Sequence, residues 1–188
     1  MTRQILVGGV PIGGGAPVVI QSMLNTKTTD VNGSLEQIAR LKAAGCQIAR
    51  LAVPNMAAAR PFSEICAQSS LPLVADIHFD YRLALESVAA GIDKIRINPG
   101  NIGDYEKVKL VANACAAKNI PIRIGVNSGS LEKSILNKYG SPCAEAIVES
   151  ALYHASLLEK FDYDNIVLSS SGPQKDHTIW DESYYGEE

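Results

Sequence analysis

Short apolar runs recur along the chain, and each is followed by a longer segment with helical periodicity. The runs cover residues 18–21, 47–53, 73–75, 94–97, 122–126 and 165–169. They are nearly continuous in hydrophobicity instead of alternating between apolar and polar residues, which indicates strands covered on both faces of a parallel sheet. We therefore predict six parallel strands.

Helices are predicted between these strands. Ser34 and Gln37 have the spacing of a capping box, and the amphipathic helix that they would begin ends at Gly45. Further helices are predicted over residues 56–69, 81–90, 105–118 and 143–160. About six βα units follow one another, an α/β arrangement that fits either a barrel or a doubly wound sheet.

Residues 5–15 precede the first predicted strand and consist of two short apolar arms around paired glycines. This pattern predicts an N-terminal β-hairpin. The glycines do not make a phosphate-binding P-loop, because Gly14 stands where that motif requires lysine and no helix follows it.

The composition is that of a folded globular domain, with 46% hydrophobic and 20% charged residues among 188. Seventeen Lys and Arg against twenty Asp and Glu give a formal charge of −3. This balance predicts no nucleic-acid partner and no anionic membrane surface. Any site for an anion must therefore be local.

Neither a membrane span nor a secretion signal is predicted. Residues 4–26 form the longest uncharged stretch, but its glycines and prolines exclude a lipid-spanning helix. The N-terminus also lacks the basic, apolar and small-residue regions of a signal peptide, which predicts a cytoplasmic protein.

Four cysteines are present, and no two have C-x-x-C spacing; they are Cys46, Cys66, Cys115 and Cys143. We interpret them as buried reduced thiols. They do not predict a metal site or an iron–sulfur cluster built by this chain alone.

Polar residues gather where the predicted strands end, which is where βα proteins bind their ligands. Asp76 and His78 follow the third strand, Asn98 ends the fourth and Asn127 ends the fifth. Glycine-rich turns after the fourth and fifth strands would let backbone N–H groups approach a phosphate.

Arg50, Arg96 and Arg123 lie inside apolar strand sequence, where a buried guanidinium needs an anionic partner. If their side chains point inward they converge, and such a cluster suits phosphate. The alternative is that carboxylates of the chain neutralise them as internal ion pairs. The candidates for this role are Asp76, Asp93 and Glu132.

His78 differs from the other two histidines in its position beside Asp76 at a strand end, where it could donate to phosphate or relay a proton. His154, on a predicted helix, and His177, near the C-terminus, are interpreted as structural. No nucleophile and base have the spacing of a known catalytic pair, so no catalytic residue is assigned.

Four segments, in order, resemble the 4-hydroxy-3-methylbut-2-enyl diphosphate synthase family, and the similarity extends over about residues 3–169. They are VIQSM at 19–23, LVADIHFDY at 73–81, KIRINPGNIG at 94–103 and IRIGVNSGSLE at 122–132. The resemblance implies a (β/α)8 TIM barrel that reductively opens 2-C-methyl-D-erythritol 2,4-cyclodiphosphate with electrons from ferredoxin or flavodoxin. It also implies a homodimer. The substrate-binding residues that it implies are Arg50, His78, Arg96, Asn98, Arg123 and Asn127.

The sequence also departs from that family. The resemblance implies a [4Fe–4S] cluster held by three cysteines and a glutamate of a C-terminal domain, which we do not find here, and eight strands where we count six. We therefore expect residues 1–169 to form an incomplete barrel and residues 170–188 a divergent, irregular tail. Where the family has a Lys-Ala-Ser phosphate contact, this chain has Ser169 and three further small residues.

Such a chain would carry part of the diphosphate site and would not complete the redox reaction alone. A natural short form, a gene fragment and a frameshift product all fit this pattern. The other functions considered are a protein that merely binds phosphorylated ligands and a pteroate-synthase-like barrel, which the four motifs fit less well.

Overall fold

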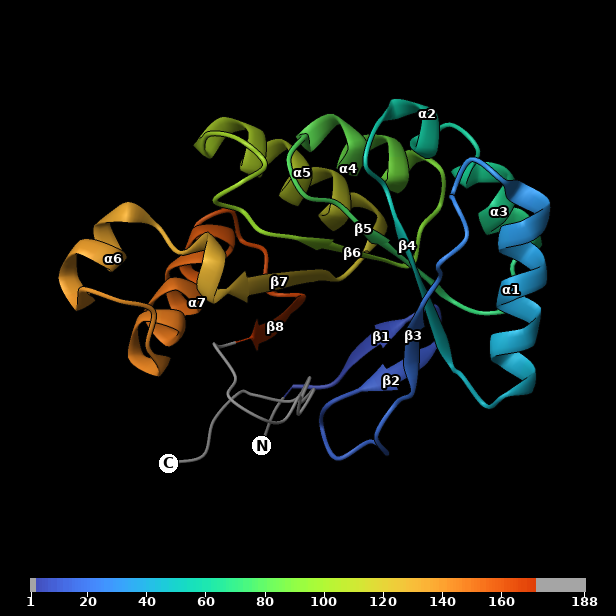
Figure 1. Ribbon diagram of the computed structural model, residues 1–188, viewed down its shortest axis with the longest axis horizontal. Coiled ribbons are helices and arrows are strands. Elements are labelled where there is room, and N and C mark those ends of the chain that lie inside the picture. Colours follow the sequence, from blue (N-terminus) through green and yellow to red (C-terminus); the bar gives the residue numbers. More distant parts are fainter. Residues whose placement is uncertain (1–2, 172–188) are drawn as a thin grey trace.

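The computed structural model describes residues 3–171, and a sheet of six parallel strands forms its centre (Figure 1). The strands are β3 (Gln21–Met23), β4 (Ile48–Ala52), β5 (Leu73–Asp76), β6 (Lys94–Ile97), β7 (Ile122–Asn127) and β8 (Ile166–Ser171). Each strand pairs with the next one along the chain, so the order is β3-β4-β5-β6-β7-β8. A doubly wound sheet reverses its order at a switch point. The consecutive order therefore excludes that alternative and confirms the barrel type.

Helices cover one face of this curled sheet, and the hairpin lies on the other side (Figure 1). The helices are α1 (Val31–Ala43), α2 (Met56–Ala59), α3 (Phe62–Gln68), α4 (Tyr81–Ala89), α5 (Tyr105–Lys118), α6 (Lys133–Tyr139) and α7 (Ala144–Glu159), with a 3₁₀ turn, η1 (Ser128–Ser130). The predicted hairpin is confirmed, since β1 (Ile5–Val7) pairs antiparallel with β2 (Val10–Ile12).

Strand parity divides the apolar residues into two clusters, because successive side chains point to opposite faces. On β4, Ala49 and Leu51 pack into the large cluster beneath the helices. The small cluster on the opposite, inner face joins strand residues to the hairpin. Its members are Ile5, Val7, Ile48, Val74 and Val167.

The hairpin covers the amino ends of the strands. A side chain at Gly8 would meet Pro72, directly before β5, and Asp93, directly before β6. At the carboxyl ends of the strands, the hairpin does not cover the inner face, and the polar residues of the strands lie there.

The predicted capping box of α1 is wrong. The helix begins at Val31 after Asp30, whose carboxylate accepts a hydrogen bond from the backbone N–H of Gly33. Gln37 instead accepts from the backbone of Thr26, and Ser34 lies buried inside the helix. Asp30, one turn before Ser34, accepts from a free N–H group of the first turn and is therefore the N-cap of α1.

Two other predicted boundaries differ. The single helix over 56–69 is broken into α2 and α3 at Pro61, which has no N–H to continue the hydrogen-bond ladder. The first strand begins at Gln21 instead of residue 18, and Val18 and Ile20 are exposed. Helix α6 was not predicted.

The last predicted strand extends two residues further than expected, so that Ser170 and Ser171 continue β8. The remainder of the predicted irregular tail lies outside the described residues, as does His177.

Candidate anion-binding site

A cavity of about 200 Å³ opens on the inner face of the sheet, at the carboxyl ends of its strands. It is lined by Arg50, Asp76, His78, Arg96, Arg123, Asn127, Ser169 and Ser170. Five of the six predicted ligand-binding residues thus meet at one place, and they come from β4, β6, β7 and the end of β5. They converge because each Arg has the inward parity of its strand.

Asp76 is the carboxylate around which the cations gather. Arg96 Nη1 donates to its Oδ1 at 3.2 Å, and Arg50 Nε lies 3.8 Å from its Oδ2. His78 Nε2 lies 4.0 Å from Oδ1. The Asp76 side chain is only 6% exposed, so these charges interact with little solvent screening. The internal ion pair considered above therefore exists for Arg50 and Arg96, but a single carboxylate serves both.

The other two carboxylates considered as partners lie elsewhere. Asp93 accepts a hydrogen bond from the backbone N–H of Leu73, at the amino end of β5, and burial raises the pKa of its carboxyl. Glu132 contacts His154 on α7. Neither neutralises an arginine of the cavity.

Arg123 lies beside Arg96 on the neighbouring strand and is 3% exposed. Its Nε donates to Ser169 Oγ at 2.9 Å. Among the described residues, the cavity lining holds three guanidiniums and one carboxylate. Arg50 and Arg96 share that one carboxylate, which favours an anionic ligand with several oxygens, since guanidinium groups bind phosphate in a planar, bidentate fashion.

Gly125 makes room for Arg96. A Cβ atom at residue 125 would lie 2.4 Å from Arg96 Nε and 2.6 Å from Nη2. The guanidinium of Arg96 therefore lies directly over the backbone of β7, and a side chain at residue 125 would displace it. The sequence pattern gave no sign of this contact.

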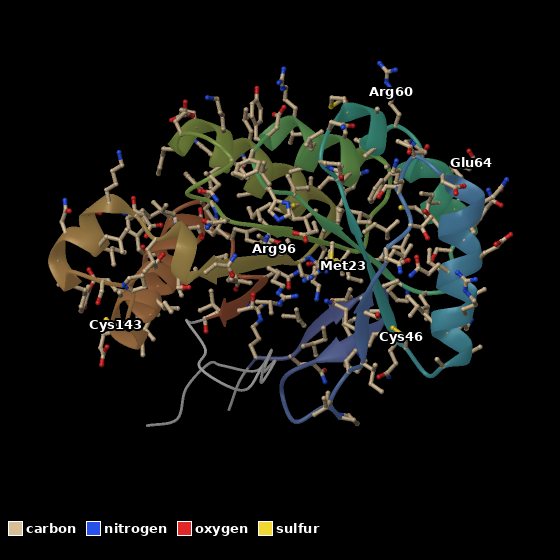
Figure 2. The ribbon with its side chains drawn as sticks, viewed as in Figure 1. Met23, Cys46, Arg60, Glu64, Arg96 and Cys143 are labelled. Atoms are coloured by element: carbon tan, nitrogen blue, oxygen red, sulfur yellow. The ribbon has the colours of Figure 1, made fainter. Side chains whose placement is uncertain are left out.

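Not every N–H group of the Arg50 guanidinium has an acceptor among the described residues. Its Nη2 contacts Met23 Sδ at 3.3 Å, and its buried Nε has no hydrogen-bond partner. Met23 and Arg96 both lie near the centre of the molecule, at the inner face of the sheet (Figure 2). Sequence reasoning missed Met23, whose sulfur forms part of the surroundings of Arg50.

Asn98 is not brought to the cavity. It is 4% exposed, and both ends of its amide are used within the protein. Nδ2 donates to Ser130 Oγ at 3.1 Å, and Oδ1 accepts from the backbone N–H of Gly100 at 3.1 Å. These bonds join the loop after β6 to the turn after β7.

His154 is buried on α7 and contacts Glu132 through Nε2, in line with the structural role predicted for it. Burial lowers the pKa of His154, and the neighbouring Glu132 carboxylate opposes this shift.

The lowered pKa of His154 predicts a loss of stability in mild acid. The folded protein binds fewer protons here than the unfolded chain, so this contribution is complete above about pH 6.5 and is lost as the pH falls below it. Denaturant unfolding at about pH 8 and about pH 5.5 should show a larger drop in the free energy of unfolding for the original protein than for His154→Gln. Equal drops would contradict this assignment.

The cysteines do not form a cofactor site within residues 3–171. All four are free, and Cys46 and Cys143 lie at opposite sides of the molecule (Figure 2). Burial raises the pKa of Cys66 to about 11, with a contribution from Asp93, and that of Cys115 to about 12. No three His, Cys, Asp or Glu side chains of these residues are grouped to hold a metal ion.

No helix in the described part of the chain is both long enough and apolar enough to cross a lipid bilayer.

Comparison with known proteins decides the family. The family model of the GcpE TIM-barrel domain matches residues 2–183. The chain belongs to the GcpE family. This confirms both the resemblance drawn from the four motifs and the predicted barrel fold.

Curated relatives in the GcpE family are named 4-hydroxy-3-methylbut-2-en-1-yl diphosphate synthase (flavodoxin). The protein of Brevibacillus brevis is 60% identical over 168 residues, which are 89% of this chain and 47% of that protein. The protein of Fusobacterium nucleatum subsp. nucleatum is 58% identical over 168 residues, 89% of this chain and 48% of that protein. The chain therefore spans about half the length of these relatives.

Solved structures support the fold alone. Dihydropteroate synthase from Vibrio fischeri aligns with a TM-score of 0.65 at 14% identity, over 89% of this chain and 66% of that one. The phospho-2-dehydro-3-deoxyheptonate aldolase of Thermotoga maritima aligns with a TM-score of 0.59 at 13% identity, over 93% of this chain and 47% of that one.

Proposed function

We propose that this chain supplies the diphosphate-binding half of a site for 2-C-methyl-D-erythritol 2,4-cyclodiphosphate. The overall reaction would be its reductive ring opening to 4-hydroxy-3-methylbut-2-enyl diphosphate in isoprenoid biosynthesis. Two electrons and two protons enter, a C–O bond to the ring phosphate breaks, and one water leaves. The observation that carries this proposal is the convergence of Arg50, Arg96 and Arg123 on one cavity, in which the first two share the carboxylate of Asp76.

The proposed ligand matches this cavity in charge. A cyclic diphosphate has oxygens on two phosphorus atoms, and three guanidiniums can neutralise both groups from different strands. The arginines would act by positioning and by charge neutralisation. His78, which is about half exposed at the cavity edge, would donate a hydrogen bond, as would the amide of Asn127.

The reducing equivalents would come from flavodoxin, which the names of the relatives give, or from ferredoxin, which the resemblance also implies. We place the reaction in the cytoplasm, and the partner implied by the resemblance is a second copy of the full-length protein. The [4Fe–4S] cluster would carry the electrons. The cysteines of residues 3–171 are separated and in part deeply buried, so the proposal places the ligands of the cluster elsewhere. We therefore assign the described residues to binding the diphosphate and not to electron transfer.

Titration calorimetry tests the binding assignment. The cyclodiphosphate should bind at least about tenfold more tightly than 2-C-methyl-D-erythritol 4-phosphate, because the second phosphate adds charge-assisted hydrogen bonds. Equal affinity for the two compounds would contradict recognition of a diphosphate. Absence of heat with either compound would contradict the site itself.

A further inference from the structure

An ionisable pair, buried on one side and partly buried on the other, lies beside the loop after β6 and the segment after β7. Glu132, directly before α6, contacts Nε2 of His154 on α7. His154 is 1% exposed, and the Glu132 side chain is 21% exposed. The pair links an outer helix to the segment that follows β7, and no residue of the pair lines the cavity.

The same pair limits the position of the loop after β6. A Cβ atom on Gly100 would lie 3.2 Å from His154 Cε1 and 3.3 Å from Glu132 Oε1. The backbone of Gly100 is therefore packed against both partners. Glycine is favoured here by close approach, because a Cβ atom would push these neighbours aside by a few tenths of an ångström; its backbone angle is ordinary, since Gly100 is not among the residues with positive φ.

Hydrogen bonds continue from Gly100 to the cavity. The N–H of Gly100 donates to Asn98 Oδ1, and Asn98 Nδ2 donates to Ser130 Oγ. Ser130 Oγ in turn donates to the backbone carbonyl of Asn127 at 3.3 Å. Asn127 lines the cavity, so a continuous path of contacts runs from α7 to the ligand site.

We infer that Glu132, His154 and Asn98 form a loop clamp, a set of positioning residues that holds the loop after β6 and, through it, fixes Asn127 at the bound diphosphate. This inference rests on the proposed function for the identity of the ligand. The clamp residues need not touch that ligand. They act because the buried amide of Asn98 and the contact between Glu132 and His154 each hold two segments of the chain together.

The charge state of the pair suits this role. When His154 is neutral, its Nε2–H group donates to the carboxylate of Glu132. Its Nδ1 then carries no proton, so no buried N–H group is left without an acceptor at this atom. The pair then holds the two loops together through one strong, charge-assisted bond.

Amide hydrogen exchange tests the clamp without any ligand. In Glu132→Ala the N–H of Gly100 should exchange at least about threefold faster than in the original protein, because the packing that holds its bond to Asn98 is lost. Glu132→Gln keeps an oxygen that accepts from His154 and should stay close to the original rate. Unchanged exchange in Glu132→Ala would overturn the clamp, whether or not the cyclodiphosphate binds.

The affinity for the cyclodiphosphate provides the second test. Asn98→Ala should weaken binding by about three- to tenfold, and the same change in an Asn127→Ala background should have little further effect, because Asn98 acts through Asn127. Asn101→Ala, an exposed asparagine of the same loop, is the matched control and should bind normally. If the original protein binds and Asn98→Ala binds equally well, or if the two effects simply add, the clamp is wrong and the proposed function stands. If the original protein does not bind, the proposed function fails and the exchange rates decide on the clamp.

Discussion

Replacing Arg96 by alanine is expected to weaken binding of the cyclodiphosphate by about 100-fold. A hydrogen bond to a charged group contributes about 1.5–3 kcal/mol, and a guanidinium can form two of them with one phosphate. Arg96 is 12% exposed at its side chain, so water replaces these bonds poorly. Titration calorimetry of the variant measures the loss.

Arg60→Ala is the matched control, because it removes the same charge from an exposed position on the helix side of the molecule (Figure 2). Its affinity should stay within about twofold of the original, since exposed charges interact weakly over such distances. If Arg60→Ala and Arg96→Ala lose affinity equally, the effect is one of net charge and the site assignment is wrong.

Gly125→Ala should reduce affinity by about 30-fold or more while leaving the protein folded. The added methyl group would overlap the guanidinium of Arg96, which lies at the end of a flexible side chain and can swing away. The displaced Arg96 would lose its alignment with phosphate, and a shift of about 1 Å at such a site has large effects. Calorimetry gives the affinity, and denaturant unfolding checks the fold.

A double-mutant cycle separates this mechanism from a general disturbance of β7. In an Arg96→Ala background, Gly125→Ala should cost almost nothing further, because the side chain that it displaces is gone. Gly129→Ala adds the same methyl group where nothing lies within 4 Å, and it should bind normally. Additive losses for residues 96 and 125 would contradict the contact described here.

The sequence predicted the parts of the fold that follow from local periodicity. The apolar run at residues 94–97 placed β6 and the helical periodicity that follows it placed α5, and both elements have the predicted bounds. The cap at Asp30 and the break at Pro61 depend on competition between neighbouring signals. Asp30 caps the helix where Ser34 was expected to, and Pro61 interrupts the helix that the surrounding residues favour.

The sequence predicted that the arginines converge if their side chains point inward, and the structure shows that they do. The sequence could not predict which side chains form hydrogen bonds and ion pairs across strands. The sharing of Asp76 by Arg50 and Arg96, and the use of Asn98 between two loops, depend on side-chain positions that a linear pattern does not contain.

A crystal structure of the chain with the bound cyclodiphosphate tests the central claim most directly. The account predicts phosphate oxygens within hydrogen-bond distance of the guanidiniums of Arg50, Arg96 and Arg123, in the cavity at the carboxyl ends of the strands. A ligand bound at another surface, or one held in this cavity without contact to those three side chains, would contradict it.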